Sequence, residues 1–484
     1  MPLVIGIDSS TQATKAEVRD ADSGALVASG RAPHPPTTPP RSEQDPHAWW
    51  AALRDALGQA CSQAPVARSV AGMAVAGQQH GLVVLDEARR VLRPAKLWND
   101  TESAPDAAWL LDRLGGPGAW AEACGSVPTA AFTITKLSWL HRTEPAIFAA
   151  AAHVLLPHDW LTAMLTGRLV TDRGDASGTG YWSPAAGSWR PDLLEIVSAD
   201  KPWPEMLPEV LGPDGTAGAA DPALTRALGL PGDIPVAVGT GDNMAAALAL
   251  GLEPGEVTFS IGTSGTVYTV SATPTADPGG AVAGFADATG RYLPLVCTLN
   301  AARVTDAAAR LLGTTADVLA DTALAADPGA GGLVLVPYLD GERTPDRPGA
   351  TGVLTGIRSD VTRAQLARAA FEGVVCGLLD GHDALRAACP TAGTNRALLV
   401  GGGARSAAYR RILADLSGLE VAVPDATELV ATGACIQAAA VATGRQPAEV
   451  AAAWGRGSQV TVEPTPGFDP GPVRQAYREA RDRA

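Results

Sequence analysis

V-I-G-I-D-S-S-T-Q-A-T-K, from Val4 to Lys15, is the stretch on which the interpretation of this sequence depends. The apolar run before Asp8 predicts a buried strand, and a second run after the polar residues predicts a partner strand. An ordinary hairpin would turn on Asn-Gly or Asp-Gly, whereas this turn has a carboxylate, hydroxyl groups and free backbone N–H groups. Such groups at the end of a strand suit a metal ion and a phosphate.

The composition is that of a folded protein with more than one domain. The 484 residues are too many for one hydrophobic core, so we expect two domains. The formal net charge of −14 argues against nucleic acid or an anionic membrane as the main partner. A nucleotide would therefore be held by backbone N–H groups, helix N-termini and a metal ion rather than by a basic patch.

Cysteine usage and the N-terminal sequence predict a cytoplasmic protein. The six cysteines lie far apart without a C-x-x-C pair, which argues against a zinc site and favours a reducing compartment. The chain starts directly with a predicted strand, so we expect no signal peptide. No run of about 18 or more apolar residues predicts a membrane span.

The order of predicted elements in the first half recurs in the second half. The first half has predicted strands at 3–8, 14–20, 25–31, 69–76 and 82–85, with a helix that starts at Asp45-Pro46. The second half has predicted strands at 256–261, 266–270, 397–400 and 420–423, and predicted helices at 406–417 and 429–443. This repetition predicts an α/β protein of two duplicated domains around a central cleft.

The repetition also predicts where the domains begin and end. We expect a first domain over residues 1–241 and a second over 242–445, with a hinge near 239–252. The remaining segment, 446–484, is predicted to be helical from its Ala and charge pattern, and the sequence does not say on which domain it packs.

One carboxylate stands at the predicted hinge. V-A-V-G-T-G-D-N-M-A-A-A, from Val236 to Ala247, puts Asp242 after a strand and two glycines and before an Ala-rich helix. One interpretation is a helix N-cap, a position that Asp favours. The other is a general base that takes a proton from a substrate hydroxyl during phosphoryl transfer.

Two glycine-containing turns follow predicted strands of the second half. F-S-I-G-T-S-G-T (259–266) resembles a phosphate cradle, although Gly and Ser are also plain turn formers. L-V-G-G-G-A-R-S (399–406) would let a flat ring or a phosphate lie against the backbone. Neither a dinucleotide-binding G-x-G-x-x-G fingerprint nor a Walker loop is present.

Two motifs of the first half suit a polyol. G-Q-Q-H-G (77–81) offers neutral donors and acceptors between two buried strands, although His80 could equally be a satisfied loop histidine. K-L-W-N-D (96–100) ends an apolar run with an aromatic ring, an amide and a carboxylate. Asp100 is more often a cap than a ligand in such a position.

In their order, these motifs resemble the FGGY family of carbohydrate kinases over essentially the whole chain. G-V-L-T-G-I-R-S-D-V-T-R-A-Q-L-A-R-A-A-F-E (352–372) and A-F-T-I-T-K-L-S-W-L (131–140) are similar to its two signatures. S-E-Q-D-P, R-P-A-K-L-W-N-D and P-Y-L-D-G-E-R-T-P are most similar to the xylulose-phosphorylating subfamily. The resemblance implies the duplicated ribonuclease H-like fold of actin and hexokinase.

The same resemblance implies a reaction and a set of site residues. It implies phosphorylation of D-xylulose at its 5-hydroxyl by ATP with Mg²⁺, with Asp242 as the catalytic base and Asp8 positioning the metal. The implied nucleotide contacts are Thr11, Gly262, Thr263, Ser264, Gly265, Gly402, Gly403 and Ser406. The implied sugar contacts are Gln79, His80, Trp98, Asp100 and Asn243.

Two residues depart from the family pattern. Gln79 stands where many relatives have Met, which could alter packing against the sugar. Glu102 stands where the family commonly has Arg. A Glu102 side chain in the cleft would replace a cation by an anion and change sugar affinity, whereas a solvated Glu on the following helix would change little.

Other functions stay open at this point. The same machinery would serve another ketose or polyol, such as ribulose. A different class is a non-catalytic sugar- or nucleotide-binding regulator or an actin-like assembly protein, although an assembly protein would not need Asp242 or the sugar-type loops. A homodimer also stays open, because the sequence does not give the oligomeric state.

Overall fold

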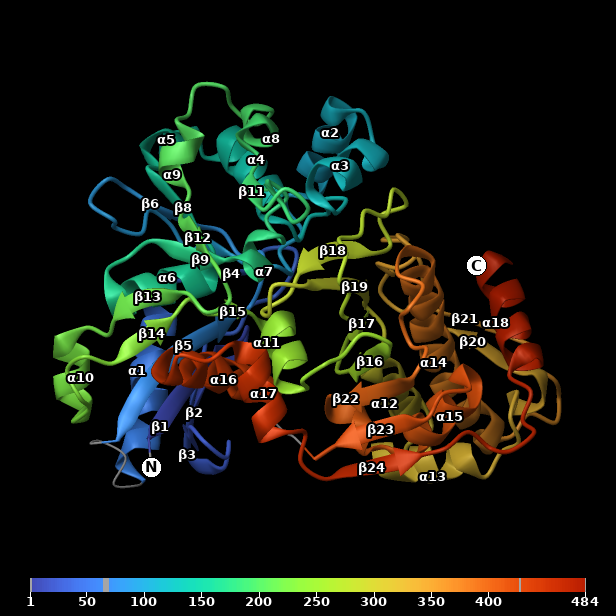
Figure 1. The fold of residues 1–484 in the computed structure, drawn as a ribbon. Coiled ribbons are helices and arrows are strands. Elements are labelled where there is room, and N and C mark those ends of the chain that lie inside the picture. The colour runs from blue at the N-terminus through green and yellow to red at the C-terminus, as the bar shows by residue number, and fades with distance from the viewer. Residues whose placement is uncertain (1, 64–68, 426–427, 484) are drawn as a thin grey trace.

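Two seven-stranded sheets form the centre of the molecule. The computed structural model describes residues 2–63, 69–425 and 428–483, and Figure 1 shows one sheet in each half of the molecule. The predicted α/β architecture of two duplicated domains is confirmed, because both sheets have an antiparallel strand meander joined to parallel strands.

In the first sheet the strand order is β13-β14-β5-β1-β2-β3, and a short strand, β15, also pairs with β5. β1 is antiparallel to β2 and parallel to β5, so its carboxyl end lies beside that of β5. The strands are β1 (Leu3–Ser9), β2 (Ala13–Asp20), β3 (Leu26–Pro33), β5 (Val70–Gly77), β13 (Thr216–Ala219), β14 (Pro235–Ala237) and β15 (Thr240–Gly241). Helix α1 (Pro46–Ser62), capped by Asp45, packs against β2 and β3.

In the second sheet the order is β18-β19-β17-β16-β22-β23-β24. β16 takes the place that β1 has in the first sheet, antiparallel to β17 and parallel to β22. The strands are β16 (Glu256–Ile261), β17 (Gly265–Tyr268), β18 (Ala283–Ala286), β19 (Tyr292–Thr298), β22 (Arg396–Val400), β23 (Val421–Pro424) and β24 (Gln459–Val462). The long helix α14 (Arg363–Ala388) and helix α15 (Ala407–Ser417) pack beside this sheet.

Two helices connect the halves. α11 (Asp242–Ala249) leaves the first half, and α16 (Leu429–Thr443) returns from the second half to pack against α11, β1 and β5. A Cβ at Gly6 of β1 would collide with the backbone of α16, so glycine allows this close approach. In Figure 1, α11, α16 and α17 (Pro447–Trp454) lie together between the two sheets.

The C-terminal segment differs from the expectation in one place. After Arg445 the chain forms α17, then β24, then α18 (Gly471–Arg483), so the prediction of helix throughout was wrong at residues 459–462. The run Q-V-T-V has two β-branched valines and a threonine, which suit a strand, and it pairs antiparallel with β23 as the edge strand of the second sheet.

The remaining elements belong to insertions around the two sheets. In the first half they are β4 (Glu43–Gln44), β6 (Val83–Leu85), β7 (Ala95–Lys96), α2 (Ala104–Leu114), α3 (Pro117–Cys124), α4 (Thr133–Thr143), α5 (Pro145–Ala150), β8 (His153–Leu155), α6 (Pro157–Thr166), β9 (Val170–Asp172), α7 (Arg173–Ala176), β10 (Trp182–Ser183), β11 (Ser188–Trp189), α8 (Pro191–Glu195), α9 (Trp203–Met206), β12 (Glu209–Leu211) and α10 (Pro222–Leu228). In the second half they are α12 (Ala302–Leu311), α13 (Ala316–Leu324), β20 (Val334–Val336) and β21 (Val353–Thr355). Among the described residues, no helix is both long and apolar enough to cross a membrane.

Candidate active site

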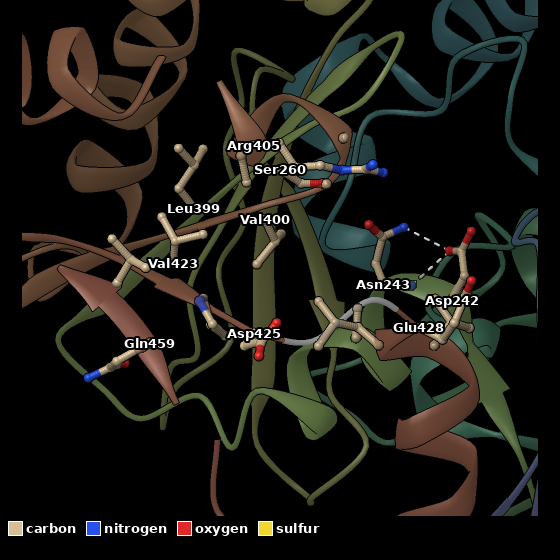
Figure 2. Close-up of a pocket in the computed structure, with 18 of the residues that line it drawn as sticks. Asp242, Asn243, Ser260, Leu399, Val400, Arg405, Val423, Asp425, Glu428 and Gln459 are labelled. Atoms are coloured by element: carbon tan, nitrogen blue, oxygen red, sulfur yellow. Dashed lines mark hydrogen bonds between the residues drawn. The ribbon is translucent and has the colours of Figure 1, made fainter. Parts of the chain in front are cut away.

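A cavity of about 840 Å³ is lined by residues of both halves (Figure 2). Its walls come from the end of β1, the start of β2, the start of α11, the turn after β22, the end of β23 and the start of β24. Four sequence-predicted site residues line it: Asp8, Asp242, Asn243 and Gly402. The cavity therefore joins the predicted metal residue, the predicted base and the glycine-rich turn.

Asp242 is the first residue of α11, and the helix N-cap is Gly241. Asp242 is therefore not the N-cap residue, and its Oδ1 accepts from the backbone N (2.7 Å) and Nδ2 (2.9 Å) of the next residue, Asn243. Burial raises the pKa of Asp242 to about 7, with further contributions from the charges of Asp8 and Asp175. Asp242 is therefore a carboxylate poised to exchange a proton near neutral pH.

Asp8 lies at the end of β1, opposite Lys15 of β2, and its side chain is almost fully buried. Lys15 Nζ is 3.6 Å from Asp8 Oδ2 and 2.6 Å from Glu428 Oε2, at the start of α16. Burial raises the pKa of Asp8 to about 6, and the charge of Lys15 partly offsets this. Asp8 Oδ1 is buried and accepts no hydrogen bond from the described residues, so one carboxylate oxygen is available to a ligand.

Three predicted site residues, Gly402, Gly403 and Ser406, follow β22 and differ in their surroundings. A Cβ at Gly402 would meet no atom within 4 Å, in line with its place on the cavity wall, whereas a Cβ at Gly403 would collide with the Ile261 side chain. Ser406 is the N-cap residue of α15, and its buried Oγ has no hydrogen-bond partner among the described residues. Only Gly402 of these three predicted residues lines the cavity itself.

The turn Gly262–Gly265 is held by the chain behind it. Gly262 N donates to Ser264 O at 3.0 Å, and the carbonyl oxygens of Gly262 and Thr263 accept from Ala302 N and Ala301 N. The cavity wall does not include this turn, although Ser260, two residues before it, does line the cavity. The predicted phosphate contact of Gly262, Thr263 and Ser264 stays a prediction.

Thr11 links the predicted phosphate turn to the predicted sugar loops. Its Oγ1 accepts from Trp98 Nε1 at 2.9 Å and donates to Gln78 Oε1 at 3.1 Å. Its backbone oxygen accepts from Gln44 Nε2 at 3.0 Å. Because Trp98 and Gln78 belong to the two polyol-type motifs, Thr11 connects the predicted phosphate turn with both predicted sugar loops.

Gln79 and His80 lie at the carboxyl end of β5, next to α11. Gln79 Oε1 accepts from Asn243 Nδ2 at 2.8 Å, which ties this loop to the residue after Asp242. His80 Nδ1 is 2.7 Å from the Gly178 carbonyl oxygen, so Nδ1 donates and Nε2 is an acceptor. Burial and the nearby Arg343 and Lys136 lower the pKa of His80 to about 3, which keeps the imidazole neutral.

Asp100 is fully buried, and protein donors bind both of its oxygens. Oδ2 accepts from Ser42 N (2.8 Å) and Lys96 Nζ (3.0 Å), and Oδ1 accepts from Glu102 N (3.1 Å). These contacts are those of a carboxylate that holds a loop in shape.

Glu102 neither projects into the large cavity nor stands on the following helix. Its Oε2 is 2.6 Å from Nζ of Lys96, whose side chain is fully buried. The carboxylates of Glu43, Asp100 and Glu102 lie close enough together to bind a metal ion, but the Lys96 ammonium group is within 3.1 Å of each. Lys96, together with Arg93 at 2.6 Å from Glu43 Oε1, therefore supplies the positive charge of this cluster.

Several residues that line the cavity were not predicted as site residues. Lys15 ends the opening motif and Arg405 lies within G-G-G-A-R-S, so both had a signal in the sequence. Ser260 lies within F-S-I-G-T-S-G-T, so it also had a signal, whereas no motif singled out Arg410, Asp425, Glu428 or the start of β24. In Figure 2, Arg405 and Ser260 lie on one side of the cavity, and Asp242 and Glu428 lie together on another.

Comparisons with known proteins agree with this architecture. The FGGY family of carbohydrate kinases matches with its N-terminal domain over residues 3–249 and its C-terminal domain over 257–442. A protein of Streptomyces coelicolor named xylulose kinase is 49% identical over 94% of this chain and 91% of its own. One of Streptomyces rubiginosus with the same name is 48% identical over the same shares.

A solved structure is similar over nearly its full length. The crystal structure of xylulose kinase from Bifidobacterium adolescentis is 41% identical, with a TM-score of 0.87 over 99% of both chains. The FGGY N-terminal and C-terminal domains together span most of the described sheets and helices, including β1, β5, α11, β16 and α16. The chain belongs to the FGGY family of carbohydrate kinases and is a carbohydrate kinase of the actin and hexokinase fold.

Proposed function

We propose that this protein transfers the γ-phosphoryl group of ATP to the 5-hydroxyl of D-xylulose and releases ADP and D-xylulose 5-phosphate. The observation that carries this proposal is the identity of 49% to a xylulose kinase over 94% of the chain. The cavity adds a physical reason, because it places a poised carboxylate, Asp242, beside a second carboxylate and a glycine-rich turn.

The nucleotide would occupy the 840 Å³ cavity, with its adenosine along Gly402 and its phosphates toward Asp8. Gly403, Ser406, Thr11 and the turn Gly262–Thr263–Ser264 would shape this site. Asp8 fits a Mg²⁺ ion through water, because its Oδ1 is a buried carboxylate oxygen without a hydrogen-bond partner among the described residues. Bound there, Mg²⁺ would neutralise phosphate charge.

The chain's own contribution is positioning and proton transfer. Asp242, as the general base, would accept the proton of the sugar hydroxyl while that oxygen attacks the γ-phosphorus in line. The hydrogen bonds that Asn243 donates to Asp242 Oδ1 fix the direction of the carboxylate. Closure of the two halves around α11 and α16 would exclude water and so limit ATP hydrolysis.

The sugar would lie between His80, Gln79, Trp98 and Asn243. The unprotonated Nε2 of the neutral His80 would accept a hydrogen bond from a sugar hydroxyl. The Phe132 ring stacks on the imidazole, with 5.0 Å between the ring centroids, and fixes its plane. Asp100 would influence sugar binding through Lys96 and the loop that carries Trp98 rather than by direct contact with the sugar.

We also propose a division of labour between the parts of the chain. Residues 1–241 would form the sugar side and 242–445 the ATP side, although α11 and α16 pack on the first sheet. The segment 446–484 would complete the ATP side through β24. The six free cysteines support a cytoplasmic location. We propose the sugar and ATP as the partners of the protein. Size-exclusion chromatography with light scattering would show whether it forms a homodimer.

The rate should depend on pH through Asp242. A raised pKa of about 7 means that the carboxylate is protonated, and inactive as a base, below that pH. We expect kcat/KM for the sugar to fall tenfold per pH unit below about 7 and to level off above it. A coupled ADP assay at saturating ATP and Mg²⁺ measures this profile, and a flat profile from pH 5.5 to 8 would contradict the assignment of Asp242 as base.

The test of the proposed function is ADP release with ATP and Mg²⁺ across D-xylulose, D-ribulose, L-ribulose, D-fructose and glycerol. We expect the highest kcat/KM for D-xylulose. A preference for another sugar would overturn the substrate and point to Gln79, whereas ATP binding without turnover on any sugar would favour the regulator alternative.

A further inference from the structure

A buried cluster of one histidine and three carboxylates lies outside the cavity. His158, in the first turn of α6, has no exposed surface. Its Nδ1 is 2.8 Å from Asp175 Oδ2, and its Nε2 is 3.3 Å from Asp159 Oδ1 and 3.7 Å from Asp172 Oδ1. Burial lowers the pKa of His158, but the three carboxylates outweigh this and raise it to about 9, so the imidazole is a cation at neutral pH.

Asp172 ties this cluster to the strand that precedes Asp242. Its Oδ2 accepts from Thr240 Oγ1 at 2.7 Å and from Gly174 N at 2.8 Å, and its Oδ1 accepts from Asp175 N at 3.0 Å. Thr240 belongs to β15, the two-residue strand beside β5 that ends directly before Asp242. The side chain of Thr240 is therefore anchored from outside its own strand.

The backbone before β15 is pressed against the same histidine. Gly239 has a φ of 84°, and a Cβ at this position would come within 2.9 Å of His158 Cδ2 and would collide with the Val75 carbonyl oxygen. Gln437 Nε2 of α16 donates to the Gly239 oxygen at 3.0 Å. The segment from Gly239 to Gly241 thus contacts β5, α6, β9 and α16. It directly precedes Asp242, which lines the cavity.

We propose that Asp172, held by the buried His158, is a positioning residue for the catalytic base and acts on Asp242 through the Thr240 hydroxyl. His158 Nε2, 3.7 Å from Asp172 Oδ1, places a positive charge beside this buried carboxylate and offsets part of the cost of burying it. A charged acceptor gives a short, strong bond to Thr240, which fixes β15 and with it the direction of the Asp242 side chain. This inference rests on the proposed function of Asp242.

The test replaces the linking hydroxyl without changing its shape. Thr240→Val removes the bond to Asp172, whereas Thr240→Ser keeps a hydroxyl. We expect Thr240→Val to lower kcat by about tenfold or more, because small misplacements of a reacting group are costly. KM for D-xylulose and ATP should change little, since His80, Gln79 and Gly402 are untouched, and Thr240→Ser should recover most of the rate.

Two further variants separate positioning from loss of stability. Thr225→Val removes a buried hydroxyl on α10, whose partner is the Pro222 oxygen in its own helix, and should keep kcat. Asp172→Asn should lower kcat, and in the double variant with Thr240→Val the two losses should not multiply, because both act on one bond. All rates are taken well below the melting temperature of each variant.

The outcomes distinguish this inference from the proposed function. If the unaltered protein turns over D-xylulose but Thr240→Val and Thr225→Val have the same kcat, the positioning role is overturned. Losses that multiply in the double variant would also overturn it. Absence of turnover in the unaltered protein with every sugar of the panel would instead overturn the proposed function on which the inference rests.

Discussion

Asp242→Asn is expected to abolish most turnover while leaving ATP binding nearly intact. The amide has almost the same shape and can still accept from the Asn243 backbone, but it cannot take a proton from the sugar hydroxyl. General base catalysis contributes about 10²- to 10⁴-fold, so kcat should fall within this range. The coupled ADP assay measures the loss, and calorimetric titration with ATP measures the binding that should persist.

Asp425→Asn is the matched control for this prediction. Asp425 lines the same cavity directly after β23, but it is exposed, lies in the second half and is apart from Asp242 in Figure 2. We expect this change to affect the KM for ATP at most and to leave kcat close to that of the unaltered protein. Equal losses in the two variants, or full turnover of Asp242→Asn, would show that Asp242 is not the base.

Local patterns predicted the elements that carry the site but not all of its side-chain directions. The β-branched and apolar runs predicted β1, β16 and β22 within a residue or two, and the prediction for residues 429–443 matched α16. Asp8 and Asp242 were predicted as site residues because each lies at or shortly after the end of a predicted strand. The position of a residue relative to a strand end depends on its neighbours in the chain, so it can be predicted from the local sequence.

The hydrogen-bond partners of Asp100 could not be predicted in the same way. A loop carboxylate looks the same in a sequence whether it faces a ligand or binds Ser42 N and Lys96, because the difference arises from tertiary packing. The His158 cluster was missed for a related reason. Its members come from α6, β9 and α7, and only the fold brings them together.

The strongest expected effect on stability is at Lys96. Its ammonium group is fully buried, lies within 3.1 Å of three carboxylates and is 3.8 Å from the centroid of the Trp139 ring. Lys96→Met keeps the volume but leaves those carboxylates with one cation fewer, and breaking a buried ion pair costs about 3–5 kcal/mol. We expect a lower melting temperature, measured by calorimetry.

The control is Lys201→Met, at a lysine whose Nζ donates only to two backbone oxygens near the surface. This change should lower the melting temperature far less than Lys96→Met. Similar shifts in the two variants would mean that the carboxylates around Lys96 are not held by its charge.

Substitutions at Glu102 test the pairing of its charge with that of Lys96. With Lys96 beside it, an arginine at position 102 would place a second cation against a buried one, so Glu102→Arg should destabilise the fold more than Glu102→Gln. If Glu102 is matched to the charge of Lys96, the double variant Lys96→Met/Glu102→Arg should recover part of the stability lost by Lys96→Met. The new guanidinium could then approach Glu43 and Asp100 in place of the ammonium group. If the losses of stability in the double variant are simply the sum of those in the single variants, the charges at positions 96 and 102 do not depend on each other.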